Sequence, residues 1–110
     1  DCADVHHAIT HNEQDFVLLH VVGSPEQFAR RHVPGALHMP WSQMTAERMA
    51  QWPEGTLFVV YCAGPHCNGA DRAALKLARL GLPVKIMLGG ITGWEDERYA
   101  FASEASVAAL

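Results

Sequence analysis

A chain of 110 residues with 49% hydrophobic and 18% charged residues can build one compact core and is too apolar to stay disordered, so we expect a single domain over residues 1–110. Its net charge of -4 and the lack of a Lys/Arg cluster argue against nucleic-acid partners. No apolar run approaches the roughly 20 residues of a membrane span. The opening DCADVHHAIT lacks the charged and apolar regions of a signal peptide, so we expect a cytoplasmic protein with no membrane partner.

Helices and one buried strand are predicted in the first half of the chain. In order they are a helix at 4–12, a strand at 16–22, a helix at 25–31, an extended piece at 33–40 and a helix at 42–52. The strand FVLLHVV is apolar almost throughout, which is typical of a strand covered on both faces. Ser24 and Gln27 form a capping box, with Pro25 at the first helical position.

The second half continues the alternation of strands and helices. In order, the pattern predicts a strand at 56–61, a helix from the N-cap Asn68 to Gly81, a strand at 84–88 and a short helix with a capping box at Thr92 to Glu95. Buried strands alternating with helices predict an α/β fold, with a mainly parallel central sheet and helices on both faces. Ligands bind beyond the carboxyl ends of such strands, and Cys62 follows the strand at 56–61 directly.

The loop CAGPHCNG, residues 62–69, joins this strand to a helix N-terminus. Glycines allow tight turns, and unpaired N–H groups at a helix start attract anions. A thiol placed there should ionise more readily than a free thiol, whose pKa is about 8.5. A strand-terminal cysteine can also be a small buried core residue, but strand end, glycine-rich loop and helix start together favour a functional site.

The chain has three cysteines, an odd number that predicts free thiols in a reducing compartment and not a disulfide framework. Cys2, at the terminus, is expected to be incidental. His66 could pair with a thiolate or be an exposed loop residue. Cys62, His66 and Cys67 do not match a common zinc spacing and lack a fourth ligand, so no metal and no cofactor is expected.

Four stretches of the chain, in order, resemble the rhodanese-like family of sulfurtransferases. They are LLHVVGSPEQFARRHVPGALHMP, FVVYC, AALKLARLGLPVKIMLGG and LGGITGW. The resemblance covers roughly residues 4–98 and implies a rhodanese-like fold. It also implies that Cys62 is a nucleophile that carries sulfur as a persulfide, and it gives His32 and Trp94 structural roles.

Two departures from the family pattern affect the site. The family's Asp and Arg after the first strand are replaced by His20 and Val22, and the loop from Cys62 is about two residues longer than usual and lacks the expected arginine. The loop resembles a two-cysteine subset of single-domain rhodaneses. A phosphatase is excluded because positions 68 and 73 hold Asn and Ala, so no guanidinium can hold phosphate.

We therefore expect a sulfurtransferase that moves sulfane sulfur from thiosulfate or a persulfide donor, such as a protein persulfide, to an acceptor such as a thiol or cyanide. Cys62 is the favoured nucleophile, and Cys67 is a second thiol or the alternative nucleophile. The remaining residues of the predicted substrate-binding loop are Ala63, Gly64, Pro65, His66, Asn68 and Gly69. The alternative is a non-catalytic rhodanese-fold redox or protein-interaction module, in which Cys62 and Cys67 cycle between dithiol and disulfide.

Overall fold

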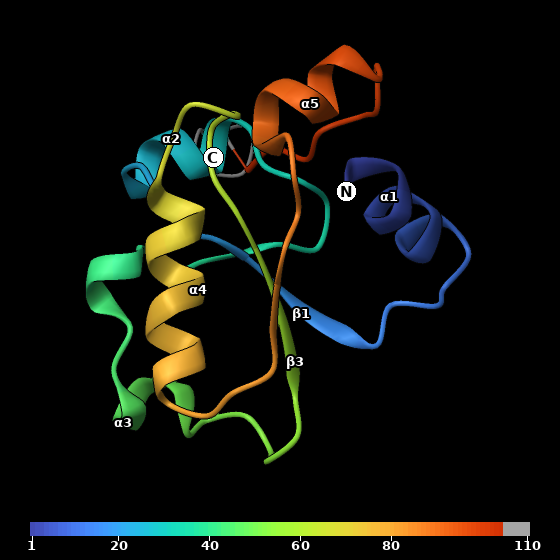
Figure 1. The fold of residues 1–110 in the computed structure, drawn as a ribbon. Helices are drawn as coiled ribbons and strands as arrows, with labels where there is room; N and C mark the ends of the chain where they lie inside the picture. The colour runs from blue at the N-terminus through green and yellow to red at the C-terminus, as the bar shows by residue number, and fades with distance from the viewer. Residues whose placement is uncertain (105–110) are drawn as a thin grey trace.

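The computed structural model describes residues 1–104, so the last six positions of the domain predicted at 1–110 lie outside the described residues. Helices and strands alternate along the chain (Figure 1). In order, the elements are α1 (Cys2–Thr10), β1 (Phe16–His20), α2 (Pro25–Arg30), β2 (Leu37–His38), the 3-10 helix η1 (Trp41–Gln43), α3 (Ala46–Met49), β3 (Leu57–Tyr61), α4 (Gly69–Arg79), β4 (Val84–Ile86) and α5 (Gly90–Asp96).

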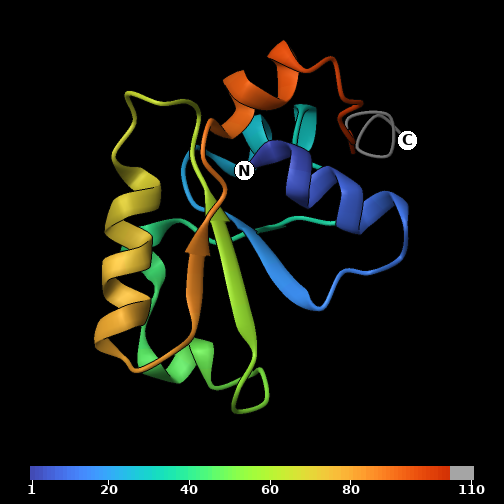
Figure 2. The same cartoon turned by 45° about the vertical axis from the view of Figure 1, so that its right-hand side comes forward.

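The strands form one sheet in the order β2-β1-β3-β4, and every pairing is parallel. Figure 2 shows α3 and α4 on one face of this sheet and α1 and α5 toward the other. The predicted α/β fold with helices on both faces is therefore confirmed. All carboxyl ends of the strands meet at one edge, where α5 and the loop that follows β3 also lie.

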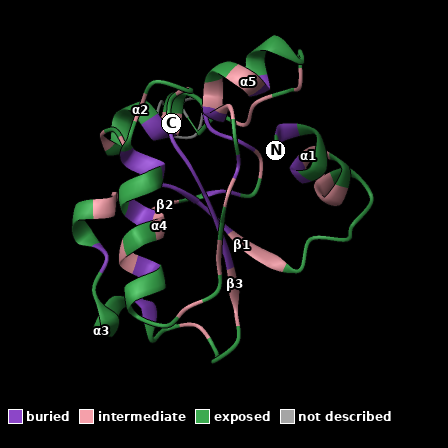
Figure 3. Ribbon diagram, viewed as in Figure 1, coloured by how far each residue is buried: buried purple, intermediate pink, exposed green. Residues whose placement is uncertain are grey.

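Side chains of β3 alternate between two hydrophobic clusters because successive residues of a strand point to opposite faces. Phe58, Val60 and Cys62 belong to the cluster under α4 and η1, whereas Val59 and Tyr61 belong to the cluster under α1, α2 and α5. The two central strands, β1 and β3, contain runs of buried residues (Figure 3). This two-sided burial explains the nearly continuous apolar runs in the sequence.

Two helix boundaries follow the predicted capping signals. At α2, the Ser24 hydroxyl accepts from the Gln27 N–H at 3.2 Å, and the Ser24 N–H donates to Gln27 Oε1 at 2.9 Å. At the end of α4, the N–H of Gly81 donates to Ala78 and that of Leu82 to Leu77, both at 3.0 Å. Gly81 adopts a φ of +78°, so these bonds form a Schellman motif of the kind that glycine favours.

Three predicted helix boundaries were wrong, each because a different residue caps the helix. The first helix begins at Cys2 because Asp1 forms a capping box with Asp4. The helix expected at 42–52 is instead two short helices, η1 and α3. The Thr45 hydroxyl accepts from the Arg48 N–H at 3.2 Å, so Thr45 is the N-cap at which α3 begins. The helix α5 begins at Gly90, and the expected capping box at Thr92 does not form.

The predicted strands at 16–22, 56–61 and 84–88 are each shorter than expected, as β1, β3 and β4 show. Within residues 1–104, the helices fall short of the length and hydrophobicity that a membrane span requires.

Candidate active site

Cys62 lies directly after β3, at the carboxyl edge of the sheet, with 3% of its surface exposed. Its side chain belongs to the hydrophobic cluster under α4. The parallel sheet places this position next to the end of β1, where Val21 donates its N–H to the Tyr61 carbonyl at 3.2 Å. The nucleophile predicted from sequence thus occupies the edge where α/β sheets bind ligands.

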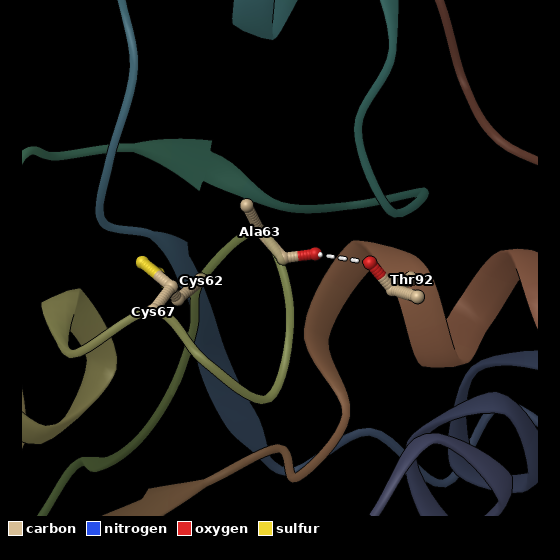
Figure 4. Close-up of a disulfide and its surroundings, with 4 residues drawn as sticks. All are labelled: Cys62, Ala63, Cys67 and Thr92. Carbon is tan, nitrogen blue, oxygen red and sulfur yellow. Dashed lines mark hydrogen bonds between the residues drawn. A yellow bond between two sulfur atoms is a disulfide. The ribbon is translucent and has the colours of Figure 1, made fainter.

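The first turn of α5 holds the start of the loop in place. The N–H of Ile91 donates to the Cys62 carbonyl at 3.0 Å, and the N–H and hydroxyl of Thr92 donate to the Ala63 carbonyl at 2.9 and 3.0 Å. Figure 4 shows Thr92 on the opposite side of the loop from the two sulfur atoms. Gly90 allows this approach, because a Cβ there would overlap the Cys62 carbonyl and its φ is +57°.

This anchoring fixes the direction of two loop amides. In a planar trans peptide the N–H points opposite to the preceding carbonyl. Since the Cys62 and Ala63 carbonyls accept hydrogen bonds from α5, the N–H groups of Ala63 and Gly64 point away from α5. Neither N–H has an acceptor among residues 1–104. The N–H of Cys67, in contrast, donates to the Gly64 carbonyl at 3.2 Å.

The N-terminus of α4 closes the other end of the loop. Asn68 occupies the N-cap position, as predicted. Its side chain makes no capping hydrogen bond, so the prediction that it caps the helix is wrong. The φ and ψ of Asn68 are -96° and 7°, and this is not the extended backbone of a typical N-cap. As a result, the first-turn N–H groups of α4 have no capping side chain and stay available to an anion.

Gly69 leaves space for the sulfur atoms of Cys62 and Cys67 because it has no side chain. A Cβ at Gly69 would lie 3.2 Å from Cys62 Sγ and 3.5 Å from Cys67 Sγ, and it would overlap the Val22 side chain. Gly69 is buried at the start of α4, and its small size lets the helix start approach the thiols. Gly69 was predicted to belong to the site because of its conformational freedom, and its small size is a second, steric reason.

Cys62 and Cys67 are joined by a disulfide, with their Cα atoms 6.2 Å apart (Figure 4). The expectation that the thiols of this pair are free is therefore wrong for the form that the structure describes. The Cα separation lies within the roughly 4.4–6.8 Å that disulfides ordinarily span. The loop thus brings its two cysteines together, as the alternative dithiol–disulfide hypothesis from sequence requires.

Pro65, His66 and Asn68 are exposed, and Gly64 is half-buried. The His66 ring makes no hydrogen bond, ion pair or ring contact within residues 1–104, so no contact here supports its pairing with a thiolate. A cavity of about 70 Å³ borders both cysteines and is lined in addition by Gly64, Pro65 and the carboxylate-bearing Asp71. A space of that size suits an added sulfur atom better than a large substrate.

His20, which stands where the family has an acidic residue, is buried beneath this region. Its Nδ1 lies 2.8 Å from the Tyr61 hydroxyl, which also accepts from the Val33 N–H at 3.1 Å. Burial, followed by repulsion from His38 and His32, lowers the pKa of His20 from 6.5 to about 4. Burial likewise raises the pKa of Tyr61, so both groups are neutral at pH 7.

We expect the buried His20 to make the protein less stable in acid. Because its folded-state pKa lies below the unfolded value of 6.5, its contribution is complete above pH 6.5 and is lost as the pH falls toward 4. The free energy of unfolding should fall by about 3 kcal/mol through this group. Denaturant unfolding between pH 7 and 4 measures it, by comparing the parent with His20→Gln. The exposed His11→Gln is the control, and an equal pH slope in all three proteins would contradict the assignment.

His32 has the structural role expected from its motif, since its Nδ1 bonds the Phe28 carbonyl at 2.7 Å. Trp94 is 1% exposed and donates its Nε1–H to the Ala100 carbonyl at 3.0 Å, so its structural role is also confirmed. Cys2 was expected to be incidental, and this is wrong. Its side chain is 5% exposed and lies 3.4 Å from the Leu88 carbonyl, so it packs α1 against the start of α5.

The model of the rhodanese-like domain family matches residues 4–97. The chain belongs to the rhodanese-like domain family. No match is found among curated protein sequences. Within residues 1–104 of this rhodanese-like domain, no group of three or more His, Cys, Asp or Glu side chains is arranged to hold a metal ion.

Solved structures share the fold of this chain. The BH2092 protein from Bacillus halodurans is 30% identical, has a TM-score of 0.87, and matches over 94% of this chain and 74% of its own. A rhodanese-like domain protein from Staphylococcus aureus shares the fold at 16% identity and a TM-score of 0.74, over 93% of each chain. A thiosulfate sulfurtransferase from Pseudomonas aeruginosa shares it at 20% identity and a TM-score of 0.72, over 93% of this chain but 19% of its own.

Two contributors to the site were missed from sequence. Thr92 was assigned to a helix cap, yet it holds the loop through the Ala63 carbonyl. His20 was noted only as a departure from the family, yet it lies under the loop edge and bonds Tyr61. The apolar context of His20 in FVLLHVV is the one signal that indicated a buried polar group.

Proposed function

We propose that this rhodanese-like domain is a sulfurtransferase whose nucleophile is Cys62. The observation that carries the proposal is the placement of a buried cysteine at the end of β3, in a loop whose Ala63 and Gly64 N–H groups have no acceptor within residues 1–104 and which leads into the uncapped N-terminus of α4. Such a cradle of N–H donors stabilises a thiolate or a charged persulfide. The thiosulfate sulfurtransferase that shares the fold supports the same chemistry.

The first half-reaction requires the reduced form, because the disulfide occupies the Cys62 sulfur. A thiol reductant opens the bond, and the Cys62 thiolate attacks the sulfane sulfur of thiosulfate. A new S–S bond forms on Cys62, the S–S bond of thiosulfate breaks, and sulfite leaves with the electron pair. Ala63 and Gly64 N–H groups and the first turn of α4 then face the negative charge of the persulfide. Pro65 has no N–H to donate.

The second half-reaction passes the outer sulfur to a thiophilic acceptor, which is cyanide in an assay and a thiol in a cell. The acceptor attacks the outer sulfur, and the Cys62 thiolate is the leaving group. We expect ping-pong kinetics, because sulfite leaves before the acceptor binds. Initial rates of the reduced protein at varied thiosulfate and cyanide should give parallel double-reciprocal lines. Intersecting lines would mean that no covalent sulfur intermediate forms.

The position of Cys67 supports an additional role as a resolving thiol. The loop already brings its sulfur to Cys62, so the Cys67 thiolate can attack the Cys62 Sγ of the persulfide. The Cys62–Cys67 bond then forms, and hydrosulfide leaves with the electron pair of the broken S–S bond. An external dithiol reduces the disulfide and restarts the cycle.

The disulfide is also compatible with a second candidate function. In this role the domain is a redox module, and Cys62 and Cys67 cycle between dithiol and disulfide without carrying sulfur. Both functions predict disulfide formation under oxidants, so oxidation does not separate them. Uptake of sulfur by the reduced protein does, because only the sulfurtransferase requires it.

A further inference from the structure

A positively charged patch, the α4 patch, consists of Arg72, Lys76 and Arg79. These residues follow one another at spacings of four and three along α4, so they share one face of the helix. The chain carries a net charge of -4, yet three of its eight Lys and Arg residues are gathered on this face. Arg72 lies in the first turn of α4, whose N-cap Asn68 follows Cys67 directly (Figure 1). The patch therefore begins beside the cysteine loop.

The indole of Trp41, in η1, holds two of these cations next to each other. The guanidinium carbon of Arg72 lies 5.1 Å from the centre of the Trp41 ring, and Lys76 Nζ lies 5.6 Å from it. Like charges four residues apart on a helix repel each other. Attraction of each cation to the face of the indole offsets part of that repulsion. The fold thus keeps both positive charges on one ring.

Within residues 1–104, no carboxylate forms an ion pair with the α4 patch, because the ion pairs found there all lie outside α4. Arg72 and Arg79 are exposed, and Lys76 is half-buried. Asp71 is next to Arg72 in sequence, but it lines the cavity beside the two cysteines, and successive helical residues point about 100° apart. Acidic groups of another molecule can therefore pair with these cations.

Trp41 also connects the α4 patch to the thiols. Its ring packs against the hydrophobic cluster that contains Cys62, and Cys67 packs against the same cluster. The backbone N–H of Trp41 donates to the Val21 carbonyl at 2.9 Å, which fixes η1 to the carboxyl edge of the sheet. Cys67 is partly exposed, whereas Cys62 is buried. A molecule that pairs with Arg72 is therefore next to the loop that carries the reactive sulfurs.

We propose that the α4 patch is a docking surface for a partner protein that carries acidic side chains around a reactive cysteine. Arg72 and Arg79 are seven residues apart, about 10 Å along the helix, so the patch matches a short acidic segment better than one small anion. Complementary charge orients the partner and raises the rate at which its thiol meets the loop.

As the docking surface of a sulfur acceptor, the α4 patch rests on the proposed sulfurtransferase function. The pairing of charges does not, because a protein thiol that reduces the Cys62–Cys67 disulfide has to reach the same loop. Reduction of the disulfide can therefore test the surface without any transfer of sulfur.

The test measures how fast cysteine peptides attack the disulfide of the oxidised protein. The peptide thiolate attacks one sulfur, a mixed disulfide forms, and the other cysteine of the loop leaves as a thiolate. Three peptides differ only in the four residues that flank their cysteine, which are glutamate, glutamine or lysine. At low salt, the ratio of the glutamate-peptide rate constant to the glutamine-peptide rate constant should fall about fivefold from the parent to Arg72→Gln/Lys76→Gln. High salt should remove this difference between the two proteins.

Arg30→Gln/Lys85→Gln is the matched control. It also removes one Arg and one Lys, both exposed, on α2 and β4. Lys85 borders α1, on the opposite face of the sheet from α4 (Figure 2). The ratio in this variant should stay within about twofold of the parent value, because the removed charges lie away from the patch. In Arg72→Glu/Lys76→Glu the lysine peptide should react faster than with the parent, a gain that misfolding cannot produce.

An equal fall of the ratio in Arg72→Gln/Lys76→Gln and in the control would overturn the proposal, since net charge alone would explain it. A second contradiction would come from competition experiments with the glutamate peptide that has serine in place of cysteine. This peptide should slow the reaction of the glutamate peptide. If inorganic sulfate slows it equally at the same ionic strength, the patch is a small-anion site and the docking surface fails.

The docking surface and the proposed function fail separately. If the peptides are discriminated as described but the reduced parent takes up no sulfur from thiosulfate, the sulfurtransferase function fails and the docking surface stands. If the reduced parent takes up sulfur but the ratio is the same in the parent and in Arg72→Gln/Lys76→Gln, the docking surface fails and the function stands.

Discussion

A Cys62→Ser variant is expected to lose sulfur transfer from thiosulfate to cyanide, with the rate falling by about 10³-fold or more, because a hydroxyl cannot replace the thiolate nucleophile. The fold should survive, since Cys62 is a small side chain at the end of β3 and serine is close to it in size. The measurement is the initial rate of thiocyanate formation by reduced protein, with thermal unfolding to verify folding.

Cys67→Ser is the matched control in the same loop. It keeps Cys62 and the amide cradle, so its rate with cyanide should stay within about threefold of the parent, in line with a residue outside the covalent step. The reverse pattern, an inactive Cys67→Ser and an active Cys62→Ser, would assign the nucleophile to Cys67. Loss of activity in both would indicate that the two thiols act only as a pair.

The release of hydrosulfide is expected to depend on Cys67. When protein is reduced, freed of reductant under anaerobic conditions and mixed with thiosulfate, the parent should release about one equivalent of hydrosulfide per chain and lose both loop thiols, because the persulfide is resolved intramolecularly. Cys67→Ser should take up sulfur but release almost none until cyanide or a dithiol is added. Hydrosulfide trapping and thiol counting measure the two quantities.

Equal release from the parent and Cys67→Ser would contradict the resolving role, since the sulfur would then leave by a route that does not need the second thiol. A parent that holds its persulfide as stably as the variant would contradict it as well. Neither result would contradict the nucleophilic role of Cys62, because the cyanide assay tests that role separately.

The parallel sheet and the position of Cys62 could be predicted from sequence, because both depend on local patterns. FVLLHVV and TLFVVY are apolar runs of strand length. Gly23 follows the first run directly, and the glycine-containing loop that begins at Cys62 follows the second. Ser24 and Gln27 are close enough in sequence to specify their own capping box. Such features need no information from distant parts of the chain.

The details of the site depend on contacts that sequence spacing does not reveal. Thr92 was predicted to cap a helix, but its hydroxyl donates a hydrogen bond to the Ala63 carbonyl, 29 residues away in the chain. Asn68 looked like a cap too, but its backbone is not extended. The pairing of Cys62 with Cys67 depends on how tightly the loop turns. Likewise, Arg72 and Lys76 meet over the Trp41 ring only because the fold places η1 beside α4.

The central claim is that Cys62 carries a sulfane sulfur, and intact mass after incubation with thiosulfate tests it most directly. The reduced parent and Cys67→Ser are each measured before and after the incubation, and again after cyanide. The account predicts that Cys67→Ser gains the mass of one sulfur atom, that cyanide removes it, and that Cys62→Ser gains none. A chain that gains no sulfur in any of these forms, and responds to oxidants only by forming the Cys62–Cys67 disulfide, would contradict the sulfurtransferase and leave the redox module in its place.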